Sequence, residues 1–319
     1  MNQHIRTIAI LGAGAVGSYL VMGLSDKYKE NLWVIADGER KDRLAKNGLN
    51  INDKVYSLHI KTPAEAHGVD LLFVCTKYTQ LRDSLPDIET ITDKHTMVVS
   101  LLNGVDSEEL IGQRIGMEHM IYSLIRIASH RIGNSIHFSL PKGYNGIYIG
   151  IPNQPACQDP RLAAIAEIFA DTPVTLHLSD DILLDMWDKF GLNVSRNLPQ
   201  AILGVGIGVY DDSIYADAIM RRMRHEVVLV ANAKGIPLTD EFKAAKWLPS
   251  QRYSTLQDLD AHRHTEIDMF SGALIRMGKE LGIPTPYNEF TYHMIKALEE
   301  KNDGLFDYQG ERDKTTWAK

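Results

Sequence analysis

The feature of this sequence that most constrains its fold is a glycine-rich turn between a short apolar run and a helix-like segment. Residues 7–17 read TIAILGAGAVG, and SYLVMGLSDKY follows directly. A G-x-G-x-x-G pattern is weak by itself but specific when a strand precedes it and a helix follows. The next apolar run, LWVIA at 32–36, stands where a βαβ unit needs its second strand. We therefore predict a dinucleotide-binding turn, whose cofactor-binding residues are Gly12, Ala13, Gly14, Ala15, Val16 and Gly17.

The three glycines of this turn have different tasks. Gly12 allows the tight turn, Gly14 lets the backbone approach a pyrophosphate, and Gly17 lets the helix pack closely on the strand. The helix that follows presents free N–H groups and the positive end of its dipole to the phosphates. The turn and the helix together predict an anion site at the end of the first strand.

An acidic residue follows at the spacing typical of NAD-binding folds. Asp37 stands 20 residues after Gly17, at the end of the second predicted strand. A carboxylate there hydrogen-bonds the ribose 2′-OH and repels a 2′-phosphate, so it favours NAD(H). Two alternatives stay open. Asp37 caps the following helix, or it turns away and Arg40 and Lys41 bind a 2′-phosphate.

Strand-like and helix-like segments alternate through the first half of the chain. Such alternation is typical of βαβ units and a doubly wound, mostly parallel sheet, and near-continuous apolar runs such as LLFVC suit strands buried on both faces. We predict an α/β dinucleotide-binding domain over residues 1–180. The predicted strands are 7–11, 32–36, 71–76, 97–102 and 120–128, then IHFSL, GIYIGI and VTLHL, with helices at 17–28, 38–47, 79–91 and 106–114.

The pattern changes near residue 180. There the last predicted strand gives way to SDD, a helix-capping sequence with acids favourable at a helix start. Beyond it the apolar residues recur with helical period and few strand-like runs intervene. We predict an all-helical domain over residues 181–319, with helices at 181–202, 213–234, 263–282 and 288–301.

Composition and charge exclude several classes of protein. Hydrophobic residues make up 44% and charged residues 24%, as in ordinary globular proteins. The formal net charge of −7 argues against a nucleic-acid or membrane-surface binder, which needs clustered positive charge. The two cysteines, Cys75 and Cys157, form no metal-binding pattern, and no apolar run is long enough to span a bilayer. We expect a cytoplasmic protein with no metal, nucleic-acid or membrane site.

A polar stripe runs through the first helix of the second domain. Lys189, Asn193 and Asn197 recur at every fourth position, so on an α-helix they fall within about 80° of one another. On a solvated face such a stripe brings little stability, because asparagine is a poor helix former. Lining a cleft, it offers a cation and several hydrogen-bonding groups to a small polar molecule. The solvated face and the cleft lining both stay open as interpretations.

A second candidate segment, STLQDLDAHRHTEID, spans residues 254–268. Ser254 and Glu266 are separated by a multiple of four, a spacing that would place a hydroxyl and a carboxylate on one helix face. His262 and His264 are two residues apart and cannot share a helix face, so a metal pair is not expected. The segment has no sequence-local hydrolase signature.

Taken together, these motifs resemble the ketopantoate reductase (2-dehydropantoate 2-reductase) family over nearly the whole chain. The matching features are GAGAVG at 12–17, CTKYTQ at 75–80, LLNGV at 101–105, the stripe that begins at Trp187, and the 254–268 segment. The resemblance implies a Rossmann domain followed by a helical domain. It also implies reduction of ketopantoate, a 2-ketoacid, to (R)-pantoate by hydride transfer from a nicotinamide, a step of pantothenate biosynthesis.

The resemblance also implies roles for individual residues. Lys189 looks like the general acid that protonates the C2 carbonyl oxygen, a task that suits a lysine whose pKa a cleft can lower. Glu266 resembles the carboxylate that holds the substrate's terminal hydroxyl, and Ser254 the hydroxyl that binds the substrate carboxylate. The remaining matches are Asn193 and Asn197, which orient the substrate, Asn103, which lies where cofactor and substrate meet, and Lys77, which lies near the cofactor.

One departure from the family keeps the cofactor open. Many members carry an arginine after the second strand for the 2′-phosphate of NADPH, and this chain has Asp37 near that place. The family thus implies NADP(H), whereas Asp37 favours NAD(H). An NAD-dependent D-2-hydroxyacid dehydrogenase of the same family is therefore an alternative function, and a non-catalytic dinucleotide sensor ranks below it. The oligomeric state stays open, with a homodimer as one alternative.

Overall fold

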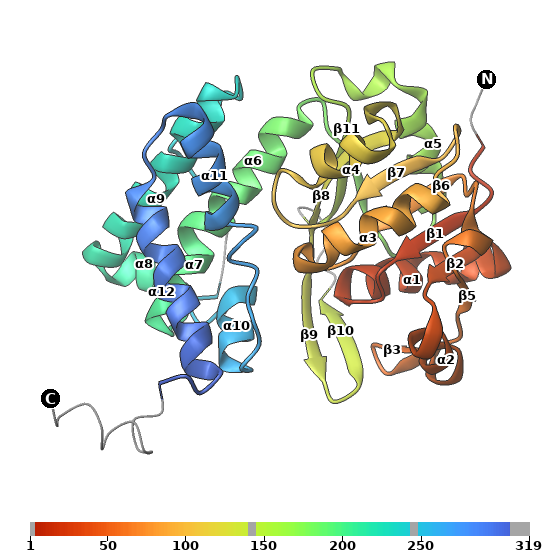
Figure 1. Ribbon diagram of the computed structural model, residues 1–319, viewed down its shortest axis with the longest axis horizontal. Coiled ribbons are helices and arrows are strands. Elements are labelled where there is room, and N and C mark those ends of the chain that lie inside the picture. Colours follow the sequence, from red (N-terminus) through yellow and green to blue (C-terminus); the bar gives the residue numbers. More distant parts are fainter. Residues whose placement is uncertain (1–3, 140–144, 243–247, 307–319) are drawn as a thin grey trace, which may run out of the picture. The chain divides into compact units, whose positions relative to one another are not determined.

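The structure is a computed structural model that describes residues 4–139, 145–242 and 248–306 (Figure 1). The chain divides into two compact units, Met1–Met186 and Trp187–Lys319. The division falls within helix α6 (Ile182–Leu192). Among the described residues, no helix is both long enough and apolar enough to cross a membrane.

The first unit is built on a large, mostly parallel sheet. All neighbouring strands in it run parallel except β11 and β8, which are antiparallel. This arrangement confirms the predicted doubly wound sheet. In order across the sheet, the strands are β12 (Leu176–Leu178), β11 (Gly146–Gly150), β8 (Met120–Arg126), β7 (Met97–Ser100), β6 (Leu71–Val74), β1 (Ile8–Leu11), β2 (Leu32–Ile35) and β5 (His59–Lys61).

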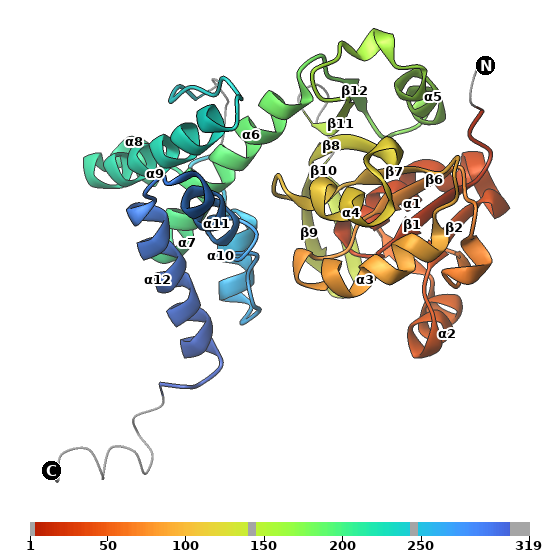
Figure 2. The same cartoon turned by 45° about the horizontal axis from the view of Figure 1, so that its top comes forward.

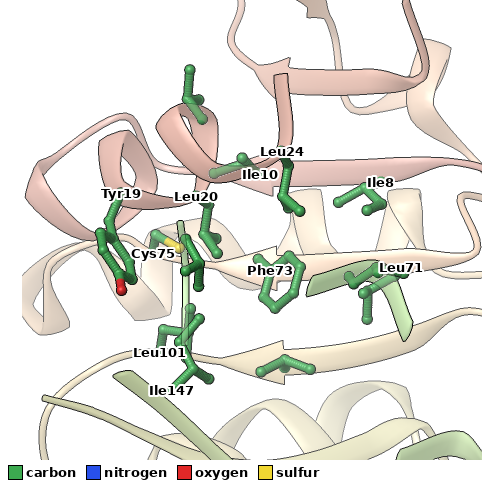
Figure 3. Packing of buried hydrophobic residues seen from close by; sticks show 14 of the residues in the cluster. Ile8, Ile10, Tyr19, Leu20, Leu24, Leu71, Phe73, Cys75, Leu101 and Ile147 are labelled. Atoms are coloured by element: carbon green, nitrogen blue, oxygen red, sulfur yellow. The ribbon is translucent and has the colours of Figure 1, made fainter. Parts of the chain in front are cut away.

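Helices cover both faces of this sheet because its central strands are apolar on both sides. Ile8 and Ile10 of β1 point into one core cluster together with Phe73 of β6 (Figure 3), while Ala9 and Leu11 belong to a second cluster on the opposite face. The near-continuous apolar runs in the sequence follow from this double burial. The first cluster contains residues of α1 (Ala15–Tyr28) and α5 (Pro160–Phe169), and the second contains residues of α3 (Tyr78–Ile91) and α4 (Ser107–Ile115).

A smaller sheet completes the first unit. The single strand predicted for 120–128 is in fact two, because the chain passes from β8 into a second strand that pairs with the next in a hairpin (Figure 2). Three short strands after helix α2 (Gly38–Asn47), two in this sheet and β5 in the large one, were not predicted, because three-residue strands leave little periodicity. In order across this sheet, the strands are β4 (Lys54–Tyr56), β3 (Leu49–Ile51), β10 (Ser135–Ser139) and β9 (Ala128–Ile132).

In the described part of the second unit, all the regular secondary structure is helical, as predicted (Figure 2). A buried arginine joins two of its helices: Arg224 donates to the Asp188 side chain of α6 over 3.0 Å and to the Thr239 carbonyl over 3.0 Å. A Cβ at Gly191 would lie 2.2 Å from the Arg224 guanidinium, so this close approach requires the glycine. The other helices are α7 (Leu198–Leu203), α8 (Val209–Asp212), α9 (Ile214–Ala233), α10 (Ser254–Asp260), α11 (Ser271–Leu281) and α12 (Pro286–Asn302).

Two helix predictions in this unit are wrong in part. The segment predicted as one regular helix over 181–202 contains a π-helix, Asn193–Asn197, between α6 and α7. The helix predicted for 263–282 begins only at Ser271. Residues 261–270 are irregular instead, and His262, with a left-handed φ of 51°, separates them from α10.

Candidate functional site

Four sequence-predicted features of the first unit come directly after neighbouring parallel strands. The glycine turn follows β1, Asp37 follows β2, Lys77 follows β6 and Asn103 follows β7. The carboxyl ends of parallel neighbours lie at one edge of a sheet, so the structure brings these residues to a common edge. The strand order also reverses between β1 and β6, and ligands of open α/β sheets bind at such a switch point.

Two glycines of the turn are required by the protein's own packing. Gly12 has φ of +109°, and a Cβ there would lie 2.6 Å from the carbonyl carbon of Cys75. A Cβ on Gly17 would lie 2.0 Å from the carbonyl oxygen of Gly12. The turn can therefore fold back between β1 and the end of β6 only if both positions lack a side chain.

The packing of the protein does not explain the third glycine. Gly14 is exposed, its φ of −79° is ordinary for any residue, and a Cβ built on it meets nothing within 4 Å. It directly precedes α1, whose first turn carries no acidic side chain to neutralise the positive end of the helix dipole. Open space over glycine backbone at such a helix start fits the pyrophosphate of a dinucleotide.

Asp37 is exposed and is not used as a helix cap. It occupies the N-cap position of α2, yet its side chain makes no capping hydrogen bond. The nearby cation Lys41 is engaged by Glu65, whose Oε2 lies 3.1 Å from the lysine Nζ. Burial and the negative charge of Asp37 raise the pKa of Asp87 on α3, so a second carboxylate lies near the first. Asp87 therefore adds negative charge near Asp37.

Lys77 and Asn103 belong to two loops that are tied together. Lys77 is exposed at the N-cap position of α3, and Asn103 is half-buried in the turn after β7. Between them, the Tyr78 hydroxyl donates to Asp106 Oδ2 over 2.6 Å. This bond holds the start of α3 against the loop that carries Asn103.

A buried carboxyl group lies directly after this loop. Glu108, in the first turn of α4, is 1% exposed, and its Oε2 accepts a hydrogen bond from Ser107 Oγ over 2.9 Å. The Ser107 hydroxyl also lies 2.8 Å from that of Ser100, at the end of β7. Within the described residues, Glu108 Oε1 has no hydrogen-bond partner. Burial raises the pKa of Glu108 to about 7, although the bond from Ser107 opposes the rise.

In the second unit, the π-helix changes how the polar stripe is presented. Its i→i+5 hydrogen bonds make a wider turn, with more residues, than that of an α-helix. Four residues make slightly more than one full turn of an α-helix, but they do not exceed one turn of this π-helix. Asn193 and Asn197, the first and last residues of this π-helix, are thereby kept close in direction. Lys189 lies one turn earlier on α6 and is half-buried. Short π segments are frequent at functional sites.

The structure brings Asn197 and Ser254 into contact, although 57 residues separate them. The buried Asn197 side chain donates through Nδ2 to Ser254 Oγ over 3.3 Å and accepts from the Thr255 N–H through Oδ1 over 3.3 Å. These bonds fix the amide's orientation and hold the start of α10 beside the π-helix. Thr255 was missed, because a backbone donor leaves no signal in side-chain spacing.

Glu266 does not share a helix face with Ser254, so that prediction is wrong. Helix α10 ends at Asp260, and Glu266 lies half-buried in the irregular segment before α11. Its carbonyl accepts hydrogen bonds from the N–H groups of Met269 and Phe270, which form a turn there. The structure therefore positions Glu266 by loop contacts rather than by helical periodicity.

Comparisons with known proteins agree with this arrangement. The family model described as ketopantoate reductase PanE/ApbA matches residues 8–154, and the model of the C-terminal part of the same family matches residues 181–299. The 2-dehydropantoate 2-reductase of Streptococcus pyogenes is 28% identical over 308 residues, which cover 92% of this chain and 97% of the relative.

Solved structures show the same similarity. A PanE/ApbA family ketopantoate reductase from Ralstonia eutropha superimposes with a TM-score of 0.75 at 25% identity, covering 93% of this chain and 99% of the other. D-mandelate dehydrogenase, in a ternary structure with NADH and anilino(oxo)acetate, gives a TM-score of 0.79 at 26% identity with the same coverage. Since both family models match in chain order, the chain belongs to the ketopantoate reductase family and is an NAD(P)-dependent oxidoreductase.

Proposed function

We propose that this protein reduces 2-dehydropantoate to (R)-pantoate, the pantothenate-forming reaction of its family. The observation that carries the proposal is the Asn197–Ser254 contact, which gathers an amide and a hydroxyl beside a π-turn that also bears Asn193. Lys189 lies one turn before them. These groups form the polar set that a small 2-ketoacid needs: donors for its carboxylate and a cation for its carbonyl oxygen.

The chemistry assigned to these residues is a hydride transfer coupled to a proton transfer. The nicotinamide, when bound, supplies the hydride to C2 of the ketoacid. The Lys189 ammonium stabilises the negative charge that develops on the carbonyl oxygen and gives that oxygen its proton, which leaves a neutral amine and an alcohol. Asn193 and Asn197 are assigned to orienting the substrate, and Asn103 to the place where cofactor and substrate meet.

The two ends of the substrate are assigned to two further residues. The Ser254 hydroxyl, exposed at the start of α10, donates to the substrate carboxylate. The Glu266 carboxylate accepts a hydrogen bond from the terminal hydroxyl that distinguishes 2-dehydropantoate from simpler 2-ketoacids. Binding one end through a donor and the other through an acceptor gives the substrate a single orientation.

For the cofactor we propose NAD(H). Asp37 makes no capping bond and is therefore available to the ribose 2′-OH, while Lys41 is engaged by Glu65. The negative charge of Asp87, which interacts with that of Asp37, also disfavours a 2′-phosphate bound beside Asp37. Lys77, exposed at the N-cap position of α3, is assigned to the cofactor.

A second function, that of an NAD-dependent D-2-hydroxyacid dehydrogenase, is favoured by the same observation on Asp37. It is also favoured by the similarity to D-mandelate dehydrogenase, which was solved with NADH. The catalytic groups would be the same in both functions. They differ in whether Glu266 has a substrate hydroxyl to bind.

Nicotinamide absorbance assays separate the two functions. The purified protein is given NADH or NADPH with 2-dehydropantoate, with the same 2-ketoacid lacking the terminal hydroxyl, or with phenylglyoxylate. The proposal predicts the highest kcat/KM for NADH with 2-dehydropantoate. A preference for phenylglyoxylate or the hydroxyl-free acid would favour the dehydrogenase, and no turnover of any pair would contradict both functions.

A further inference from the structure

The segment that carries Glu266 is held in place by one face of helix α12. It runs from Ala261 to Phe270 between α10 and α11, and it lacks the regular hydrogen bonds of a helix over most of its length. Its shape must therefore come from contacts with a neighbour. The structure shows such contacts on both sides of Glu266.

On the N-terminal side, Glu299 accepts hydrogen bonds from the residue directly before Glu266. The Glu299 side chain is 2% exposed, and its Oε1 accepts from both the N–H and the hydroxyl of Thr265, each over 2.7 Å. Its Oε2 accepts from Lys296 Nζ over 2.8 Å. Both carboxylate oxygens are thus occupied, and one of them is committed to the backbone of the segment.

On the C-terminal side, the contact is made by Tyr292. Its hydroxyl donates to Asp268 Oδ1 over 2.7 Å, and Lys296 Nζ lies 3.9 Å from Asp268 Oδ2. The bonds from α12 therefore reach the residue before Glu266 and the second residue after it. A shift of either contact moves the backbone from which the Glu266 side chain extends.

The three side chains share one face of α12. Tyr292, Lys296 and Glu299 are spaced by four and three residues, which places them within about 60° of one another on an α-helix. The helix itself is anchored at its start, because Glu226 of α9 accepts from the N–H groups of Tyr287 and Asn288 over 2.8 and 3.0 Å. We call this face, formed by Tyr292, Lys296 and Glu299, the α12 clamp.

The charge of Glu299 suits this role. Burial alone would raise its pKa, but the hydrogen bonds from Lys296 and Thr265 outweigh burial and lower it. The carboxylate is therefore ionised at neutral pH, where its bonds to Thr265 are charge-assisted and roughly twice as strong as neutral ones.

We propose that Glu299 and Tyr292 are positioning residues that set the Glu266 carboxylate for the terminal hydroxyl of the substrate. This inference rests on the proposed function, since it assigns Glu266 to that hydroxyl. The clamp residues themselves do not touch the substrate in this account. They act through Glu266, so they control which 2-ketoacid is bound rather than the rate of hydride transfer.

Steady-state kinetics with two substrates test the inference. Glu299→Gln should raise KM for 2-dehydropantoate about tenfold, which corresponds to about 1.4 kcal/mol of binding free energy. The value of kcat should stay within about twofold of wild type. KM for the same acid lacking the terminal hydroxyl should change by less than about twofold. Tyr292→Phe should shift KM in the same direction by a smaller factor. Glu300→Gln, an exposed neighbour on α12, is the control and should change neither constant.

A double mutant shows whether the clamp acts through Glu266. If it does, Glu299→Gln should add nothing to the KM of a Glu266→Ala variant, whereas independent effects would multiply. Equal losses on both substrates, or multiplied effects in the double mutant, overturn the inference. If the wild-type enzyme shows no preference for the substrate with the hydroxyl, the proposed function fails and the inference with it. A wild-type preference that survives both variants overturns the inference alone.

Discussion

At the scale of single residues, the three glycines of the turn have different physical reasons. The fold requires two of them, and only a bound ligand explains the third. Gly12 and Gly17 are required because a Cβ at either would collide with backbone atoms. Gly14 has an ordinary backbone conformation and open space. The sequence motif predicts all three together, but only the structure shows that their physical reasons differ.

The charge around Asp37 leads to a prediction about cofactor choice. Asp37→Ala removes the carboxylate that would hydrogen-bond the ribose 2′-OH and repel a 2′-phosphate. A hydrogen bond to a charged group contributes about 1.5–3 kcal/mol, so the dissociation constant of NADPH divided by that of NADH should fall by about tenfold or more. Fluorescence titration of the bound nicotinamide measures both constants.

A matched control for this prediction lies two residues further on. Glu39→Ala removes another exposed acid from the first turn of α2 and changes the local net charge equally. It should leave the cofactor ratio within about twofold of wild type. An unchanged ratio in the Asp37 variant, or equal changes in both, would show that Asp37 does not select the cofactor.

At the scale of elements, the glycine turn allows fold and ligand binding to be tested apart. Gly17→Ala places a Cβ 2.0 Å from the Gly12 carbonyl oxygen, so α1 must move away from β1 and the melting temperature should fall by several degrees. Gly14→Ala meets no protein atom and should melt within about a degree of wild type.

The cofactor affinity of the Gly14→Ala variant should nevertheless fall about tenfold or more, because the added methyl occupies space that the pyrophosphate needs. Calorimetry and cofactor titration on the same samples provide both measurements. Unchanged affinity in a fully folded Gly14→Ala protein would mean that the phosphates do not approach this backbone.

The secondary-structure elements differ in how far the sequence predicts them. The central strands of the large sheet and the helices between them were predictable, because apolar runs buried on both faces alternate with helical periods over long stretches. The edge strand β5 and helix α5 were not predicted. The π-helix at Asn193–Asn197 was not, since its residues continue the helical period of α6 and nothing in them signals a wider turn. Local propensity does not encode such a feature.

The irregular segment before α11 is a second feature that the sequence does not predict. Ser254 and Glu266 have helical spacing, but His262 adopts a positive φ and α12 supplies the bonds that hold Thr265. The partner of Thr265 is Glu299, 34 residues away. Contacts at this distance follow from how helices pack, so a single sequence predicts the site residues by resemblance but not how they are supported.

At the scale of the whole molecule, the buried Glu108 makes stability depend on pH. Its pKa is raised from 4.5 to about 7 in the folded protein, so the folded state binds this proton more tightly than the unfolded chain does. The free energy of unfolding therefore falls as pH rises from about 4.5 to about 7, by about 3 kcal/mol in total. Above this window the loss is complete.

Glu108→Gln should remove this dependence, because glutamine cannot titrate. Thermal melts between pH 5 and pH 8 should show a smaller decline for this variant than for wild type. Glu109→Gln, an exposed neighbour on the same helix, should behave like wild type. If wild type and Glu108→Gln decline in parallel, Glu108 does not change its protonation in this range.

The central claim is that Lys189 donates the proton in a nicotinamide-dependent reduction, and single-turnover kinetics test it most directly. Enzyme saturated with NADH is mixed with 2-dehydropantoate, and oxidation of the bound nicotinamide is followed by absorbance. Lys189→Ala should slow this step by about 10²–10⁴-fold with an unchanged cofactor dissociation constant. Lys279→Ala, which removes an exposed lysine of α11, should match wild type. A single-turnover rate in Lys189→Ala close to that of wild type would contradict the account.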